Sequence, residues 1–517
     1  MERAWALLEQ GGYLGSNADP AALAVKGRLL KDRARRAAPA ERPALFRQAA
    51  DAYGRALALA PAPYLAINAA TALLLSGDTA GAAAGAQAVL ALLNAPEPPA
   101  DTAYYLAATR AEALLLLGDE AGARAAMAVA AQHDPDGWED RAVTLAQLRA
   151  IGGHQGRALA WLQAFAPPPS LHFVGHLGIA SGGASEARLV GEVDAFIARH
   201  QPGFAWGAIA AGTDIVVAER LLAAGCALHV VLPCPSDLFA AQSVAPAGEA
   251  WVARFSALQS AAASLRIAGP GASSVHDPIA TAHAGELAIG GALLNARRLG
   301  SAALQLVIAD ALGGGANTRR QAAMWPRAAG EQTVLTAPRD SAVEASFPPE
   351  QPDPERALAV HVVIGLDALP ASEVLSSARI AALVDPLSAA LALLDRGAVR
   401  AHPGGWELTL TDLPQALATI AALLAAAHTA GTSSPAIGLA LEMATLHTDT
   451  ASGALVPFGP GAALARRLQA MAPAGTALAS DAAAVCLAVH GKCAMRSELY
   501  HAGEPELGGA VHALLAD

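Results

Sequence analysis

Apolar positions recur with a helical period through the first part of the chain. Between residues 41 and 163 they predict helices over about 47–60, 64–75, 79–93, 104–117 and 120–132. Pro61 stops the first helix, and the dipeptides Gly77-Asp78 and Gly118-Asp119 each end a later one and precede a helix of small residues. Residues 1–165 are therefore predicted to form all-α helical repeats in antiparallel pairs.

Buried strands and amphipathic helices alternate through the middle of the chain. One apolar run ends at Ile209, a turn occupies 211–214, and a helix over 215–224 ends at Gly225. The next run, 228–232, is short, continuously apolar and closed by Pro233, as is typical of a buried parallel strand. This alternation predicts a central α/β domain with a Rossmann-like parallel sheet over residues 169–340.

The last third of the chain changes pattern again. A proline-rich, charged stretch at 347–355 predicts a linker over 341–356. Strands are then predicted at 357–365, 405–411 and 436–444, with a long helix at 413–428. The pattern predicts a C-terminal α+β domain over 357–517, which makes the whole protein multidomain.

Composition narrows the classes of function. The chain has 517 residues, 54% of them hydrophobic but only 4% aromatic, because alanine dominates, and it contains very few lysines. This bias is typical of a high-GC bacterial coding sequence. A net charge of −11 argues against a nucleic-acid groove, which needs clustered cations. The one basic cluster, Lys26 to Arg36, also contains Asp32 and is interpreted as a solvated helix face.

The lack of a recognisable targeting signal and the pattern of cysteines predict a cytoplasmic protein. The start of the chain lacks the charged and apolar regions of a signal peptide, and no apolar run is suited to cross a membrane. The cysteines form no CxxC pair, and Cys226 and Cys234, beside a helix end and a strand end, are predicted to be buried free thiols. The other two are Cys486 and Cys493.

The turn at 211–214 carries the first candidate chemistry. It joins a strand to a helix, so the N–H groups at the helix start are free to attract a phosphate or another anion. Asp214 either caps those same groups or faces a ribose hydroxyl. A turn of this kind is needed in any α/β domain, so alone it does not decide between a site and ordinary structure.

Several other segments, taken in their order along the chain, favour the interpretation of this turn as a ligand site. They are 173–176 (Phe-Val-Gly-His), 206–233, 237–255, and the strand 304–310 with the glycine-rich turn 313–318. In this order they resemble the SLOG superfamily, a Rossmann-like group that includes the DNA-processing protein A and the "lonely guy" nucleotide hydrolases. The resemblance covers residues 169–340 and implies a nucleotide-type ligand. The residues that it assigns to the pocket are Gly175, His176, Gly212, Thr213, Asp214, Gly314, Gly315 and Thr318.

The resemblance departs from the hydrolytic members at one place. In them a glutamate follows the threonine of the glycine-rich turn, whereas here Thr318 precedes Arg319, Arg320 and a glutamine. Glu219 or Glu186 could substitute, although each also fits a surface or capping position. No residue is therefore predicted to be catalytic, and none to bind a metal.

The arginines of this region have two interpretations. Arg188, Arg319 and Arg320 follow the first turn and the glycine-rich turn. They could clamp phosphates if both turns converge at the carboxyl ends of parallel strands. Arg319 and Arg320 fit an exposed helix start equally well.

The N-terminal repeats resemble tetratricopeptide repeats. The Leu-x-Gly-Asp endings recur 41 positions apart, a spacing longer than that family's usual period, and the proline-rich stretch 96–99 explains it as an inserted loop. Such repeats bind a peptide partner or pack against the protein's own domains. Both options stay open.

The C-terminal region resembles class III nucleotide cyclases. The matching segments are 437–442 (Ile-Gly-Leu-Ala-Leu-Glu), 459–468 and 473–480. Cyclase chemistry needs two metal-binding aspartates, but 361–365 holds none, Asp367 comes about two residues late, and 404–406 reads Gly-Gly-Trp. Ala463 stands where the family has its asparagine, while Arg467 matches its arginine. The resemblance implies a catalytically silent cyclase-like domain that can pair as a homodimer.

Three hypotheses follow for function. The first is a cytoplasmic regulator that senses a nucleotide or a nucleotide derivative. The second is a nucleotide hydrolase that cleaves an N-glycosidic bond or a phosphate ester in the central domain. The third is an interaction scaffold without a ligand.

Overall fold

The structure is a computed structural model in which the chain forms two compact units, Met1–Pro167 with Arg298–Gly300, and Pro168–Arg297 with Ser301–Asp517. Asp367 and Cys493, both named above, lie outside the described residues. The structure describes residues 4–5, 8–9, 11–15, 18–95, 101–272, 274–326, 329–366, 377–392, 394–395, 398–402, 404–430, 434–450, 453, 455–490, 495–504 and 507–516.

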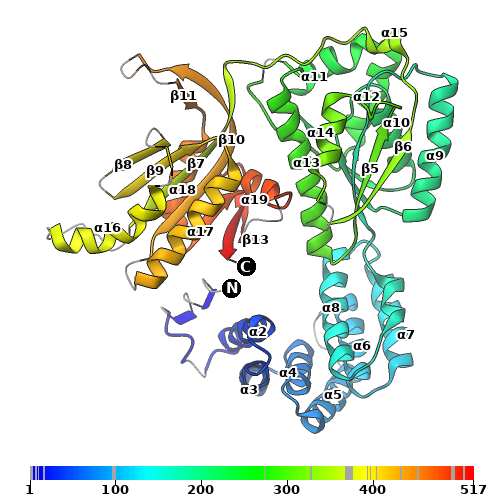
Figure 1. Cartoon of the computed structure of the whole chain (residues 1–517). Helices are drawn as coiled ribbons and strands as arrows, with labels where there is room; N and C mark the ends of the chain where they lie inside the picture. The colour runs from blue at the N-terminus through cyan, green and yellow to red at the C-terminus, as the bar shows by residue number, and fades with distance from the viewer. Residues whose placement is uncertain are drawn as a thin grey trace. The chain divides into compact units, whose positions relative to one another are not determined.

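The first unit is all-α. Most consecutive helices pack on one another (Figure 1). Alanines make up much of the core between them, and such small side chains let helices approach closely. This confirms the predicted helical repeats. The elements are α2 (Pro20–Arg36), α3 (Arg42–Leu59), α4 (Pro63–Leu75), α5 (Thr79–Leu93), α6 (Ala103–Leu116), α7 (Glu120–His133), α8 (Trp138–His154) and the 3₁₀ helix η1 (Ala160–Phe165).

The recurring Gly-Asp endings have a simple physical role. Gly77 and Gly118 adopt positive φ of 94° and 83°, which ends α4 and α6 at little cost to a glycine. The aspartate that follows each glycine caps the next helix: Oδ1 of Asp78 accepts a hydrogen bond from the Gly81 amide at 2.8 Å, as Asp119 does from Gly122. The recurring Gly-Asp pair therefore marks the end of one helix, at the glycine, and the beginning of the next, at the aspartate.

The basic cluster on α2 is only partly solvated. Its arginines at 28, 35 and 36 are exposed, but Lys31 is buried. Lys31 donates to Asn68 Oδ1 at 2.6 Å and Gln147 Oε1 at 3.3 Å, and burial lowers its pKa to about 8. The interpretation as a solvated helix face is therefore wrong for Lys31, which ties α2 to α4 and α8 inside the unit.

The second unit begins with a parallel sheet. Its order is β4-β3-β2-β1-β5-β6, and every pairing is parallel, as predicted for a Rossmann-like domain. The strands are β1 (Ser170–Val174), β2 (Phe204–Gly207), β3 (Ala227–Leu232), β4 (Ser264–Ile267), β5 (Ala303–Ala309) and β6 (Gly330–Thr336). The helices are α9 (Ala184–His200), α10 (Thr213–Ala223), α11 (Ser236–Ser243), η2 (Ala245–Ala247), α12 (Glu249–Ala261), α13 (Pro278–Leu299), α14 (Ala316–Met324) and α15 (Ser341–Glu344).

A mixed sheet follows in the same unit, as the predicted α+β pattern requires. Its order is β13-β14-β12-β10-β7-β9-β8, with β11 paired to β10, and only β10 and β12 pair in parallel. The strands are β7 (Arg356–Gly365), β8 (Val399–His402), β9 (Gly405–Leu410), β10 (Ala436–Thr448), β11 (Leu455–Phe458), β12 (Ala477–Ser480), β13 (Met495–Glu504) and β14 (Gly509–Ala516). The helices are α16 (Ser377–Leu391), α17 (Leu413–Ala430), α18 (Gly461–Met471) and α19 (Asp481–Leu487).

Apolar packing joins the two sheets of this unit. On the first sheet, α9, α10 and α12 share one core with the strands, whereas Ala284, Leu287 and Ala288 of α13 belong to the core of the mixed sheet. Gly290 marks the closest approach, because a Cβ on it would lie 2.1 Å from the backbone oxygen of Val485 in α19. Helix α13 is therefore shared between the sheets.

Two smaller expectations have clear outcomes. Cys226 and Cys234 are buried and free, as predicted, and so is Cys486. Within the part of the chain that the structure describes, no helix combines the length and the apolar character needed to cross a membrane.

Candidate functional site

A cavity of about 490 Å³ opens at the carboxyl ends of the parallel strands. From β1 the chain builds the sheet through β2, β3 and β4 in one direction, and then places β5 and β6 on the other side of β1. The cavity lies where that direction reverses, because it is lined by Gly175 and His176 after β1 and by residues 315–318 after β5. Ligands of open α/β sheets bind at such a switch point.

Two threonines hold the turns around the cavity. Thr213 Oγ1 donates to the carbonyl of His176 at 3.0 Å, and Thr318 Oγ1 donates to that of Gly175 at 2.6 Å. Gly175 has no room for a side chain, since a Cβ there would lie 1.8 Å from Thr213 Oγ1. These contacts draw the loops after β1 and β5 and the start of α10 into one compact wall.

His176 is part of the same wall. Its Nδ1 lies 2.7 Å from the carbonyl oxygen of Leu177, and its Nε2 lies 3.0 Å from that of Ala337. Because both ring nitrogens face main-chain carbonyls, the imidazole joins the β1 loop to the end of β6. It lines the cavity, and in its neutral form the ring donates its single N–H to one of these two carbonyls.

Asp214 is a buried carboxyl of the cavity with an oxygen that has no hydrogen-bond partner. It lies in the first turn of α10, is 8% exposed, and its Oδ1 is buried without a hydrogen-bond partner. Burial raises its pKa to about 7, against the opposing effect of main-chain hydrogen bonds at Gly175 and Ala210. A buried carboxyl with an unused oxygen beside a cavity is a strong candidate for a ligand contact.

The glycine-rich turn after β5 prepares an anion site. Asp310 Oδ1 accepts hydrogen bonds from the amides of Leu312 and Gly314, both at 2.8 Å, and so fixes the turn. Gly315 is the N-cap of α14 and offers no capping side chain. The first residues of α14 line the cavity, so their uncapped N–H groups and the positive helix end are available to a phosphate or carboxylate.

The sequence analysis missed one cation at this place. Arg339 lines the cavity three positions after β6, its Nε lies 2.8 Å from Asp310 Oδ2, and its Nη1 pairs with Glu344. Its Nη2 would lie 3.6 Å from a Cβ built on Gly315, which places the guanidinium over the start of α14. The available signal was its position just after a parallel strand, where ligand contacts concentrate.

The structure brings most of the predicted pocket residues together. Gly175, His176, Asp214, Gly315 and Thr318 line the cavity, whereas Gly212, Thr213 and Gly314 lie behind its surface and shape the turns. Gly212 and Gly314 have positive φ of 98° and 85°, which glycine tolerates best. Their contribution is to backbone geometry.

The other candidate charges are paired elsewhere. Glu186 and Glu219 both form ion pairs with Arg254, at 2.7 and 2.6 Å, and neither lines the cavity. Arg188 pairs with Glu192 on an exposed helix face. Arg319 donates to the carbonyl of Gly314, and Arg320 pairs with Glu350, so their guanidiniums support the rim of the cavity.

The predicted linker forms part of the cavity wall. Residues 347–350 line it, and Glu350 reaches Arg320 at 3.2 Å. The Gln351 amide donates to the carbonyl of His276 at 2.8 Å, which fixes the end of this stretch on the first sheet. The segment that leads into the mixed sheet therefore contacts the cavity directly.

The mixed sheet contains a histidine–glutamate pair, buried at the histidine and partly buried at the glutamate, that the sequence analysis also missed. Strand β7 carries no acidic residue, but His361 on it lies 3.1 Å, Nε2 to Oε1, from Glu442 on β10. The second oxygen of Glu442 is buried without a partner. Glu442 interrupts the otherwise apolar stretch 436–444 of β10, which was the available signal.

Comparison with known proteins adds a family match at the N-terminus. Residues 1–74 match the family model described as Tetratricopeptide Repeats-Sensor. No curated protein matches the chain.

Three of the similar solved structures each match 31% of the chain. The guanylyl cyclase domain of the RhoGC fusion protein from Blastocladiella emersonii is 12% identical, with a TM-score of 0.25, over 31% of this chain and 95% of that one. The adenylyl cyclase CyaB from P. aeruginosa is 14% identical, with a TM-score of 0.25, over 31% and 94%. The guanylate cyclase domain of RhGC from Catenaria anguillulae, solved with GTP, is 16% identical, with a TM-score of 0.25, over 31% and 97%. Likenesses at this level carry no conclusion about activity.

Proposed function

We propose that this protein is a cytoplasmic regulator that binds a nucleotide or nucleotide derivative in the cavity of the first sheet. The observation that carries the proposal is the cavity at the switch point, lined both by Asp214, whose Oδ1 is buried without a hydrogen-bond partner, and by the uncapped start of α14. The motif order that resembles the SLOG superfamily supports the same ligand class. The N-terminal repeats supply the surface for a protein partner.

The cavity has the parts that a nucleotide needs. The start of α14 and the Arg339 guanidinium provide an anion-binding end. Asp214 provides a hydrogen-bonding group for a ribose hydroxyl or an exocyclic amine. Val231, Phe239 and Ala288 line the cavity with apolar surface, and a volume of about 490 Å³ lies within the usual range for small-molecule sites.

The first test is native mass spectrometry of the whole protein with a panel of nucleotides. We expect one equivalent of a phosphate-bearing ligand, and about 10-fold to 100-fold weaker binding in Arg339→Ala because an ionic contact in a partly enclosed site is lost. Arg188→Ala is the matched control, since that arginine pairs on an exposed helix face, and it should bind as the wild type does.

The outcomes separate the hypotheses. Asp214→Ala should also lose the adduct. An adduct that decays to a smaller product in the wild type would favour the nucleotide hydrolase, for which Asp214, whose pKa burial raises to about 7, is a candidate general acid or base. Failure of every nucleotide to bind would leave the scaffold hypothesis.

We further propose that the mixed sheet is a catalytically silent cyclase-like domain. It transmits ligand binding in the cavity to the rest of the protein, either as a homodimer or as a monomer. The support is that described strand β7 carries no acidic residue, while residues 404–406 read Gly-Gly-Trp. Without two carboxylates the metals of a cyclase lack hard oxygen ligands. The linker segment 347–350 offers a direct path from the cavity to β7.

Incubation with ATP or GTP and Mn²⁺ tests the silence of this domain. We expect no 3′,5′-cyclic nucleotide by mass spectrometry, at protein concentrations high enough to favour a dimer. Formation of a cyclic product would contradict the proposal. Loss of that product in Asp367→Ala would identify Asp367 as a metal-binding carboxylate of an active cyclase.

A further inference from the structure

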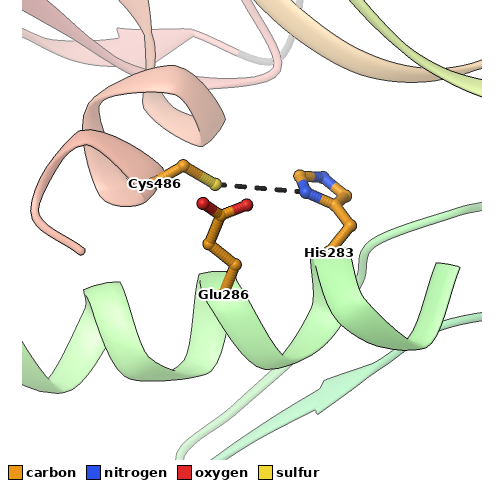
Figure 2. Close-up of side chains that lie close together, drawn as sticks. All are labelled: His283, Glu286 and Cys486. Carbon is orange, nitrogen blue, oxygen red and sulfur yellow. Dashed lines mark hydrogen bonds between the residues drawn. The ribbon is translucent and has the colours of Figure 1, made fainter. Parts of the chain in front are cut away.

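Three buried side chains with metal-binding atoms converge between α13 and α19. They are His283 and Glu286 on α13, and Cys486 on α19, and Figure 2 shows them pointing toward one another. None of the three lines the cavity of the proposed function, although their neighbours Ala284 and Gly285 on α13 do. All three are buried: His283 is 3% exposed, Glu286 8% and Cys486 0%. Burying an imidazole, a carboxylate and a thiol together is costly unless they find strong partners.

The spacing of the residues places them on two facing surfaces. His283 and Glu286 are separated by three positions on α13, so they lie on one face of the helix. Cys486 lies near the end of α19, where α13 and α19 approach so closely that Gly290 tolerates no side chain. The backbones therefore hold the three donors at a fixed junction between the first sheet and the mixed sheet.

The distances suit a small cation. The nitrogen, oxygen and sulfur donors all lie within 4.8 Å of one another, and His283 Nδ1 is 4.0 Å from Cys486 Sγ. Bonds of about 2.0 to 2.3 Å to a tetrahedral Zn²⁺ would set such donors roughly 3.3 to 3.6 Å apart. On binding, the side chains would rotate to shorten the observed separations, 4.0 Å between His283 Nδ1 and Cys486 Sγ, to those values.

Hydrogen bonding among the three does not satisfy them well. Within the described residues, the only hydrogen-bond contact of the His283 ring is the one with Cys486 Sγ, at the long limit for sulfur. Burial raises the pKa of the Cys486 thiol well above its ordinary value and lowers that of His283 to about 4. Cys486 is thus a poor nucleophile, being both inaccessible and protonated, whereas a neutral imidazole is the form that binds metals.

From this geometry we infer that His283, Glu286 and Cys486 bind a divalent transition-metal ion, with Zn²⁺ as the best match. The mixture of sulfur, nitrogen and oxygen donors is typical of zinc and unlike the all-oxygen sites of Mg²⁺ or Ca²⁺. The ion would hold α13 to α19 and thereby fix the two sheets of this unit to each other.

Charge balance favours the bound state. On binding, the Cys486 S–H bond breaks, the thiolate sulfur bonds to the metal, and the proton passes to solvent. One thiolate and one carboxylate then neutralise the two positive charges of the ion, so the buried centre carries no net charge. Arg266, an arginine whose charge acts on His283, already pairs with Asp481 at 2.6 Å.

His490 supports the carboxylate ligand from outside. Its Nε2 contacts Oε1 of Glu286, and that hydrogen bond raises the pKa of His490. Hydrogen bonds from outer residues orient metal ligands and commonly change the affinity about 10-fold to 100-fold. His490 is therefore a positioning residue of this site.

Cobalt titration of the metal-free whole protein tests the inference. We expect one equivalent of Co²⁺ to bind, with a near-ultraviolet band of thiolate-to-cobalt charge transfer and visible bands of tetrahedral strength, and Zn²⁺ to displace it. Cys486→Ala should abolish the charge-transfer band, and His490→Ala should keep the band but weaken binding about 10-fold to 100-fold. The matched control, Cys234→Ala, removes another buried free thiol and should leave the spectrum unchanged.

Several outcomes would overturn the inference. One is a wild-type spectrum without a thiolate band, a readout that needs no variant to fold. Another is a band that persists in Cys486→Ala but disappears in Cys234→Ala or Cys493→Ala. If Cys486→Ala does not fold, Glu286→Gln, which keeps the shape of the side chain, should lower the Co²⁺ affinity at least 10-fold, and unchanged affinity would count against the site.

Discussion

At pH 8 the Asp214→Asn variant should be more stable to unfolding than the wild type, by roughly 4 kcal/mol, while its nucleotide affinity falls. The carboxyl has a pKa of about 7 in the folded protein and 3.8 as an ordinary side chain. Each unit of difference corresponds to about 1.4 kcal/mol. Asparagine keeps the shape of the protonated acid without the buried charge.

The direction of the pH effect follows from that rise in pKa. Between pH 4 and 7 the folded protein holds a proton on Asp214 that the unfolded chain has released. This contribution to stability is fully present below pH 4 and is lost as pH rises through 7. The advantage of Asp214→Asn over the wild type should therefore be near zero at pH 4 and grow up to about pH 8.

Hydrogen exchange of the β1 amides at several pH values, followed by mass spectrometry, measures the opening of the first sheet in both proteins. Asp237→Asn is the control, because that aspartate occupies the first turn of α11 and is exposed. Parallel pH curves for the wild type and Asp214→Asn would contradict the prediction. A gain in stability combined with a loss of binding is the signature of a carboxyl kept for function.

Gly438→Ala should destabilise the mixed sheet by about 3 kcal/mol or more. A Cβ at this position would lie 2.0 Å from the backbone oxygen of Ala465 and 2.4 Å from the amide nitrogen of Gln469. Both contacts are main-chain atoms of α18, so no flexible side chain can give way. Strand β10 and α18 would have to separate, and overpacking of this kind commonly costs 1 to 3 kcal/mol or more.

Urea unfolding measured by circular dichroism checks this, with Gly191→Ala as the matched control. Gly191 lies within α9, and a Cβ there meets nothing within 4 Å. Alanine in a helix is favoured over glycine by about 0.5 to 1 kcal/mol, so the control should be neutral or slightly stabilising. Equal effects of the two substitutions would show that α18 does not pack against β10 as described.

The elements of the fold could largely be predicted from the sequence. Periodicity and turn residues place α5 at Thr79–Leu93 and β3 at Ala227–Leu232 within a residue of the predicted bounds, because both patterns are local. The glycine-rich turn was equally visible, since positive φ at Gly314 demands a residue without a side chain. The contact between this turn and the loop after β1 could also be predicted, because loops that follow neighbouring parallel strands lie at the same edge of the sheet.

Long-range partners could not be predicted in this way. Arg339 joins the cavity only because β6 lies beside β5, and Glu219 leaves the list of candidates only because Arg254, on another helix, pairs with it. Lys31 has the sequence context of a solvated helix face, but its side chain is buried and donates a hydrogen bond to Asn68 of another helix. In each case the partner is far along the chain, where periodicity carries no information.

The chain's local chemistry, its helical and strand periods and its turn glycines, determines the helical repeats and the two α/β regions. Which polar groups end up buried, paired or left with an unused atom depends on contacts between elements far apart in sequence. His283 and Cys486 are separated by 203 positions and meet only because α13 packs against α19. Burial and proximity then set the chemistry of Asp214 and of this cluster, since a side chain's pKa and its partners depend on its surroundings and not on its neighbours in the sequence.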